Sequence, residues 1–134
     1  MGEDRRDEDF GCEDCWPEAA DAAWSKRGGL TRVAELIDES HFHVMILECG
    51  RCTQRFISIF TETIDWSDGD DPQYWQLMPI NGAEAAVLIE QGHSLDETKL
   101  DRLGPGRRSL HRDYPSGGTR VCFWSTGISV GPHD

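Results

Sequence analysis

The sequence predicts a single small α+β domain that contains a β-hairpin, a short antiparallel sheet and about four short helices. Apolar runs rich in aromatic and β-branched residues predict the strands, and segments with caps and glycine stops predict the helices. The length of 134 residues fits one hydrophobic core, and no linker is long enough to divide the chain. We therefore expect a mobile acidic arm at residues 1–11, followed by one domain at residues 12–134.

Two short helices are predicted ahead of the hairpin. Pro17 suits the first turn of a helix over residues 17–26, which Gly28 and Gly29 would end. Thr31 is a candidate cap for the second helix. Three apolar residues of that segment recur at helical spacing and predict one apolar face: Val33, Leu36 and Ile37.

The β-hairpin is predicted at residues 42–64, where two apolar, β-branched runs flank a tight loop. A third strand is expected at residues 74–78. Asn81, with Glu84 three residues later, forms a capping-box pattern for a helix that Gly92 would end. The remaining predicted elements are a helix that begins at Ser94 and ends at Gly104, and strands at residues 108–113 and 119–124.

Two Cys-x-x-Cys pairs are the most informative motif, Cys12 with Cys15 and Cys49 with Cys52. A two-residue gap lets both sulfurs of one short loop reach the same ion, and structural Zn²⁺ is held tetrahedrally by four ligands. The four cysteines therefore predict a structural Zn²⁺ site. A closed shell of four thiolates leaves no position for water, so this metal is not expected to be catalytic. A redox pair would instead close a strand and open a helix, whereas residues 53–63 favour a strand.

The two cysteine pairs and the hairpin together resemble the zinc-ribbon family over residues 12–64. This resemblance implies that the second pair forms a metal-binding knuckle between two strands. The chain departs from the ribbon pattern at Trp16 and Thr53, where ribbon knuckles usually carry glycine, and in the 33 residues that separate Cys15 from Cys49. Residues 65–74 are also similar to a segment of small uncharacterised bacterial zinc-ribbon-like proteins, a resemblance that implies no activity.

Alternatives remain open for two histidines and for the fifth cysteine. Strand alternation puts His41 and His43 on the same face as Cys49, so either histidine could replace one sulfur of the N-terminal pair. Cys122 is expected to be a small buried hydrophobe. Its competing role is that of a nucleophile, with one of two histidines as the base: His111 or His93.

The formal net charge is −12, and four thiolates around one Zn²⁺ would add a further −2. This charge disfavours broad binding to nucleic acid, which requires a basic surface, and favours a basic protein partner. No run approaches 18 apolar residues, so no membrane span is predicted. The acidic N-terminus lacks the features of a signal peptide, so we expect a cytoplasmic protein whose paired cysteines bind metal rather than form disulfides.

An acidic and aromatic segment is the candidate partner-binding surface. Its aromatic residues would supply contact area, while its carboxylates would steer a basic partner. The alternative is a solvated acidic turn, and the spacing of the carboxylates does not match a calcium-binding loop. The candidate residues are Asp65, Trp66, Asp68, Asp70, Asp71, Tyr74 and Trp75.

Residues 99–120 reverse the charge, with six basic residues against two acidic ones. They either pair with the protein's own carboxylates or hold single-stranded nucleic acid. The chain lacks phosphate-loop, His-Glu-x-x-His and Gly-x-Ser-x-Gly motifs, so we do not expect an enzyme. The leading hypothesis is a zinc-stabilised protein-binding protein, in its specific form an immunity protein or inhibitor of a basic bacterial toxin. The alternative is a zinc-ribbon accessory factor of transcription or translation that contacts nucleic acid.

Overall fold

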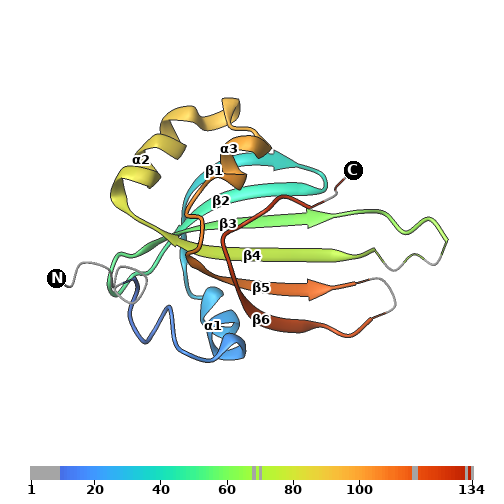
Figure 1. Ribbon diagram of the computed structural model, residues 1–134, viewed down its shortest axis with the longest axis horizontal. Coiled ribbons are helices and arrows are strands. Elements are labelled where there is room, and N and C mark those ends of the chain that lie inside the picture. The colour runs from blue at the N-terminus through green and yellow to red at the C-terminus, as the bar shows by residue number, and fades with distance from the viewer. Residues whose placement is uncertain (1–9, 68, 70, 116–117, 132, 134) are drawn as a thin grey trace.

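A six-stranded antiparallel sheet forms the centre of the computed structural model, which describes residues 10–67, 69, 71–115, 118–131 and 133 (Figure 1). Residues 1–9 of the predicted acidic arm lie outside this described part. The strands are adjacent in chain order, so each one pairs with its neighbour in the sequence. They are β1 (Thr31–Glu39), β2 (Phe42–Glu48), β3 (Arg55–Glu62), β4 (Gln73–Ile80), β5 (Arg108–Tyr114) and β6 (Val121–Thr126).

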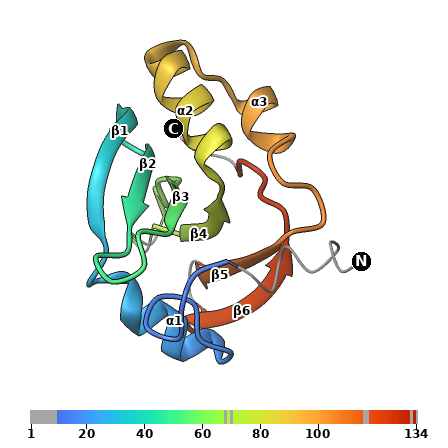
Figure 2. The same ribbon diagram turned by 90° about the vertical axis from the view of Figure 1, so that its left-hand side faces the viewer.

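Helices cover both faces of this sheet. The N-terminal helix contributes Ala23 to a hydrophobic cluster on one face, whereas the two later α-helices contribute Leu88 and Leu100 to a cluster on the other. Figure 2 shows the N-terminal helix on the opposite side of the sheet from the two later helices. The helices are α1 (Ala20–Arg27), α2 (Gly82–Gln91), the 3-10 turn η2 (Gly92–Ser94) and α3 (Glu97–Asp101).

The predicted fold class was wrong in its proportions. The domain is mixed α+β, but the short sheet is a six-stranded one, and the described residues form three α-helices and one 3-10 turn rather than about four helices. The main cause is the segment predicted as the second helix, which is the edge strand β1. The hairpin, the third strand and the two C-terminal strands were predicted close to their observed bounds.

Irregular pairing of β1 with β2 explains why the apolar residues of β1 have the spacing of a helix. The register against β2 shifts between Arg32 and Ala34 and again between Glu35 and Ile37. Such a bulge adds a residue to one strand and interrupts the alternation of its side chains. Leu36 and Ile37 are therefore both buried although they are neighbours. Buried neighbours fit a helix face better than a regular strand, so spacing alone favoured the wrong element.

The predicted capping box at the start of α2 is confirmed. The Asn81 side chain accepts a hydrogen bond from the Glu84 N–H at 2.7 Å, and the Glu84 carboxylate accepts one from the Asn81 N–H at 2.8 Å. The following helix begins later than predicted. Asp96, not Ser94, caps α3 by accepting a hydrogen bond from the Lys99 N–H at 3.0 Å.

Two hydrophobic cores lie on opposite faces of the sheet, and we call them the helix-side core and the cysteine-side core. Successive side chains of β3 alternate between them, because Ile57 belongs to the first and Phe56 to the second. The helix-side core also contains Ile46, Ile59, Met78, Leu88 and Leu100. The cysteine-side core also contains Cys15, Trp16, Cys49, Leu77 and Leu110.

Candidate metal centre

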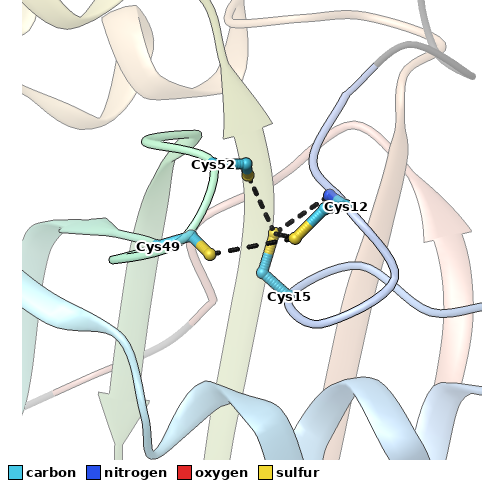
Figure 3. Close-up of side chains that lie close together, drawn as sticks. All are labelled: Cys12, Cys15, Cys49 and Cys52. Carbon is cyan, nitrogen blue, oxygen red and sulfur yellow. Dashed lines mark hydrogen bonds between the residues drawn. The ribbon is translucent and has the colours of Figure 1, made fainter.

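The second Cys-x-x-Cys loop forms the turn between β2 and β3, and the first loop lies beside it (Figure 3). Cys49 follows β2 and Cys52 precedes β3, and the Thr53 N–H closes the turn by donating to the Cys49 carbonyl at 2.9 Å. Cys12 and Cys15 lie in a turn of the N-terminal segment, where the Cys15 N–H donates to the Cys12 carbonyl at 3.1 Å. The chain between the loops runs through α1, β1 and β2, which accounts for the long gap in the sequence.

The four sulfur atoms have the spacing of a tetrahedral metal shell. Cys12 Sγ lies 3.8 Å from Cys15 Sγ and 4.0 Å from Cys49 Sγ, and Cys15 Sγ lies 3.7 Å from Cys52 Sγ. All four ligand atoms are within 4.8 Å of one another. In a tetrahedral site with metal–sulfur bonds of about 2.3 Å, the sulfurs are about 3.8 Å apart, whereas a disulfide requires about 2.05 Å. The predicted grouping of these cysteines into a possible metal-binding site is therefore confirmed.

Backbone N–H groups point at two of the sulfurs. The Cys12 N–H donates to Cys15 Sγ at 3.3 Å, and the Arg51 N–H donates to Cys49 Sγ at 3.4 Å. Burial alone would raise the pKa of the Cys49 thiol, but the N–H groups of Cys52 and Arg51 bring that pKa down to about 7. These hydrogen bonds stabilise negative charge on the sulfur, which is the form that binds a metal.

The rest of the cluster resists ionisation when no cation is present. Burial raises the pKa values of both Cys15 and Cys52, and for Cys15 the three neighbouring thiols add to the effect. Several thiolates this close together repel one another unless a cation lies between them. A divalent ion with an affinity for sulfur supplies that charge, so the donor set fits such a metal.

The two loops depart from the glycine pattern of zinc ribbons in an informative way. Thr53 has a φ of 65°, and it is the one non-glycine residue with positive φ in the described part of the chain. It therefore adopts the left-handed conformation that glycine would favour at this position. On the other loop, Gly11 has a φ of 73°, and a Cβ there would lie 2.7 Å from Trp16 Cβ and 3.1 Å from Cys15 Sγ. Only glycine fits this approach.

Gln54 holds the two loops in register, a role that no sequence pattern indicated. Its side-chain oxygen accepts a hydrogen bond from the Gly11 N–H at 3.0 Å. Its side-chain nitrogen donates to the carbonyls of Arg55 and Ile80, both at 2.8 Å. One amide thus joins the N-terminal loop, β3 and the end of β4 beside the sulfur cluster.

The central residues of the two loops also pair at the surface. Arg51, between Cys49 and Cys52, lies 3.1 Å from the carboxylate of Asp14, between Cys12 and Cys15. This hydrogen bond raises the pKa of the Arg51 guanidinium. Lys26 of α1 lies 3.9 Å from the same carboxylate. Exposed ion pairs stabilise weakly, so we assign this contact to alignment of the loops rather than to stability.

The two histidines considered as replacement ligands lie in other contacts. His41 Nδ1 is 3.0 Å from Glu62, and His43 Nδ1 is 3.2 Å from Asp38. His43, Asp38 and Glu35 form a second group whose candidate ligand atoms lie within 4.8 Å of one another, but both carboxylates are exposed. Neither His41 nor His43 therefore lies among the four sulfurs.

The acidic loop between β3 and β4 uses its own carboxylates to fold. The Asp65 N–H donates to Asp71 Oδ1 at 2.8 Å, and the Ser67 N–H donates to Asp65 Oδ1 at 3.1 Å. Trp66 is 83% exposed, the highest value among the exposed large hydrophobic residues of the described chain. Two further candidates, Asp68 and Asp70, lie outside the described residues.

The last two candidate partner-binding residues lie on opposite faces of β4. Trp75 packs on the cysteine side, with its ring 5.6 Å from Trp24 and 5.0 Å from Phe60. Tyr74 faces the other side and lines a small cavity. The candidate surface is therefore divided between the two faces of β4.

The arginines of the basic segment, residues 99–120, contact mainly aromatic rings. The Arg107 guanidinium donates to both oxygens of Glu84, at 2.8 and 3.1 Å. Three further arginines lie over aromatic rings: Arg108 over Trp124 at 4.0 Å, Arg112 over Trp24 at 4.7 Å and Arg120 over Tyr114 at 4.6 Å. Such contacts are cation–π interactions. Most of this charge is thus used inside the fold, although Arg107 alone has the predicted carboxylate partner among the described residues.

Cys122 is half-buried on the cysteine side of β6. Burial raises the pKa of its thiol, and the nearby Asp21 carboxylate raises it further. His111 pairs with Phe123 across the strands and faces the opposite side of the sheet, so it does not reach Cys122. The side chain of His93 lies outside the described part of the structure. His111 is therefore not in place to act as a base for Cys122.

Comparison with known proteins finds no match for this chain among protein-family models, curated proteins or solved structures. None of the described helices is long and apolar enough to cross a membrane. The class that fold and site define is thus a mixed α+β protein with a possible four-cysteine metal centre.

Proposed function

We propose that Cys12, Cys15, Cys49 and Cys52 hold one Zn²⁺ ion with a structural role. The sulfur–sulfur distances of 3.7–4.0 Å carry this proposal. Tetrahedral four-sulfur shells select zinc or iron among common metals, and zinc suits a closed site with no redox task. Metal analysis of native protein should give one zinc per chain, and an iron-containing red protein would contradict the assignment.

The proposed ion would attach the N-terminal segment to the sheet. Residues 10–16 reach the cysteine-side core mainly through this cluster, through Gln54 and through Trp16, whose ring lies 5.3 Å from Phe56. Metal binding energy is folding energy when the site does not exist in the unfolded chain. A metal that is coordinated by four thiolates has no open position for substrate, which supports a non-enzymatic role.

The proposed activity is binding to a basic protein partner through the loop between β3 and β4. The net charge of −12 favours such a partner, and the exposure of Trp66 supplies an aromatic anchor. Hydrogen bonds to the Asp71 and Asp65 carboxylates connect residues 65, 67 and 71 of this loop before any partner binds. Preorganised loops lose less conformational freedom on binding.

A narrower form of this proposal is an immunity protein or inhibitor that neutralises a basic bacterial toxin. Small size and strong negative charge support this form. The nucleic-acid alternative draws less support, because Arg107, Arg108, Arg112 and Arg120 already have partners within the fold. A gel-shift experiment with short single-stranded oligonucleotides should show no salt-dependent complex.

The partner proposal is tested with Trp66→Ala in the zinc-loaded protein. A partner is recovered at low salt with the wild-type chain as bait, purified, and its dissociation constant is measured for each variant. We expect a partner with a pI above about 9 and an affinity loss of at least about tenfold in Trp66→Ala. Val87→Ala is the matched control, because Val87 is an exposed apolar residue of α2. An acidic partner, or equal losses in both variants, would contradict the proposed surface.

A further inference from the structure

A small polar cavity lies on the helix side of the sheet, away from the cysteines. Its volume is about 170 Å³, and its lining includes Thr61 of β3, Tyr74 of β4 and His111 and Asp113 of β5. This space is large enough to admit a short functional group.

The segment after β6 forms one wall of the cavity. It crosses the sheet near β3 and β4 (Figure 1). There the Gln76 side chain makes two hydrogen bonds to the backbone of Ser129. The Gln76 side-chain oxygen accepts the Ser129 N–H at 3.0 Å, and its nitrogen donates to the Ser129 carbonyl. Ser109 Oγ fixes the start of the same segment by donating to the Gly127 carbonyl at 2.6 Å. The wall is thus attached to the sheet by side chains at two positions.

One hydrogen-bonding atom of the lining is buried without a partner. Thr61 is 1% exposed, and its Oγ1 has no hydrogen-bond partner among the described residues. Leaving a buried hydroxyl unpaired costs stability, so natural structures usually satisfy such groups. Since Thr61 lines the cavity, a ligand atom there could satisfy its hydroxyl.

Two further side chains of the lining, Asp113 and His111, offer acceptor atoms. No cation lies within ion-pair distance of Asp113 in the part of the chain that the structure describes, and burial raises the pKa of this carboxyl group. His111 Nε2 lies 2.9 Å from Ser109 Oγ. Because the Ser109 hydroxyl proton goes to Gly127, the hydrogen-bond network assigns the Nε2 proton to His111 and leaves Nδ1 as an acceptor. Burial lowers the pKa of His111, which keeps the ring neutral.

We propose that this cavity binds a primary alkylammonium group. An ammonium carries three N–H donors and no acceptor, which complements the Asp113 carboxylate, the Thr61 hydroxyl and a neutral His111. Tyr74 adds an aromatic face of the kind that attracts cations. The group belongs either to a free amine or to a lysine side chain. The lysine source rests on the proposed function, since Tyr74 is also part of the proposed partner surface.

The test is an NMR titration of the zinc-loaded protein with n-butylammonium chloride, followed through the backbone signals of Thr61 and Ser129 and the ring signals of His111. We expect saturable shifts that n-butanol and n-butyrate do not produce. Asp113→Asn should weaken binding by at least about tenfold, because it removes the charge that pairs with the ammonium. Glu90→Gln is the charge-matched control on α2 and should bind as the wild type does.

Thr61→Val separates a binding role from a structural one. The change removes an unpaired buried hydroxyl at nearly constant volume, so the protein should remain folded and become no less stable, while n-butylammonium binding falls several-fold. Unchanged binding in Thr61→Val and Asp113→Asn, or equal shifts with n-butanol, would overturn the proposal.

A second titration, with N-acetyl-lysine methylamide and its ε-acetylated form, distinguishes the two sources. Binding of N-acetyl-lysine methylamide, but not of its ε-acetylated form, assigns the cavity to a lysine side chain. Binding of n-butylammonium alone assigns the cavity to a free amine. Trp66→Ala should leave both titrations unchanged, so failure of the partner surface and failure of this cavity give different results.

Discussion

The two faces of the sheet are stabilised by different means. On the helix-side face, α2 carries a capping box, and α2 and α3 cover a continuous apolar core. On the cysteine-side face, α1 begins after Ala19, which makes no side-chain cap, and buries Ala23. Capped helices that bury apolar side chains stabilise the first face. The second face relies on the sulfur cluster and on aromatic and arginine contacts.

The possible metal site thus lies on the face whose helix has no side-chain cap and buries only Ala23. Arg108 lies over Trp124 at 4.0 Å, and Trp16 packs edge-on against the same ring at 4.9 Å. The Trp124 indole N–H donates to the Glu18 carbonyl at 2.8 Å, just before α1. These contacts align the N-terminal segment, but each contributes little alone.

Loss of the metal should open the cysteine-side face. We expect Cys49→Ser, or treatment with a strong chelator, to lower the free energy of unfolding by at least about 4 kcal/mol. Near-UV circular dichroism should lose the signals of Trp16, Trp24 and Trp124, while the far-UV spectrum keeps most of its strand signal.

Cys122→Ser is the matched control for that experiment, because Cys122 lies outside the sulfur cluster. It should retain one metal per chain and nearly wild-type stability. If chelation left both the native mass and the unfolding curve unchanged, the metal centre would be excluded.

A cavity in the helix-side core should destabilise the protein without affecting the metal. Leu100 of α3 is fully buried there, so Leu100→Ala should cost about 3 kcal/mol in urea unfolding. Native mass spectrometry should still detect one metal ion per chain. Loss of the metal together with stability would show that the two faces unfold as one unit.

The sequence allowed the site to be predicted better than the fold. The four cysteines are recognisable because metal ligands must be particular residue types at short spacing, so Cys12 and Cys49 could be grouped despite the intervening helix and strands. Strand β1 could not be recognised, because its bulges bury Leu36 and Ile37 side by side and disguise the alternation. Bulges depend on the partner strand, which local spacing does not contain.

The remaining features depend on long-range contacts. Gln54 reaches Gly11 and Ile80, which lie 43 and 26 residues away in the chain, and no local motif indicates either contact. The cavity near Asp113 exists because the C-terminal segment returns across β4 to Gln76. Such tertiary contacts override local propensity and appear only when the chain is folded.

The smallest expected effect concerns the conformation of the second cysteine loop. Thr53 has a φ of 65°, which is strained for a β-branched residue. Thr53→Gly should therefore raise the free energy of unfolding of the metal-loaded protein by about 0.5–1 kcal/mol, after the greater entropy of glycine in the unfolded chain is included. Thr63→Gly, at a position without positive φ, should instead lower the stability by a similar amount. Equal destabilisation by both changes would show that Thr53 contributes contacts that outweigh its backbone strain.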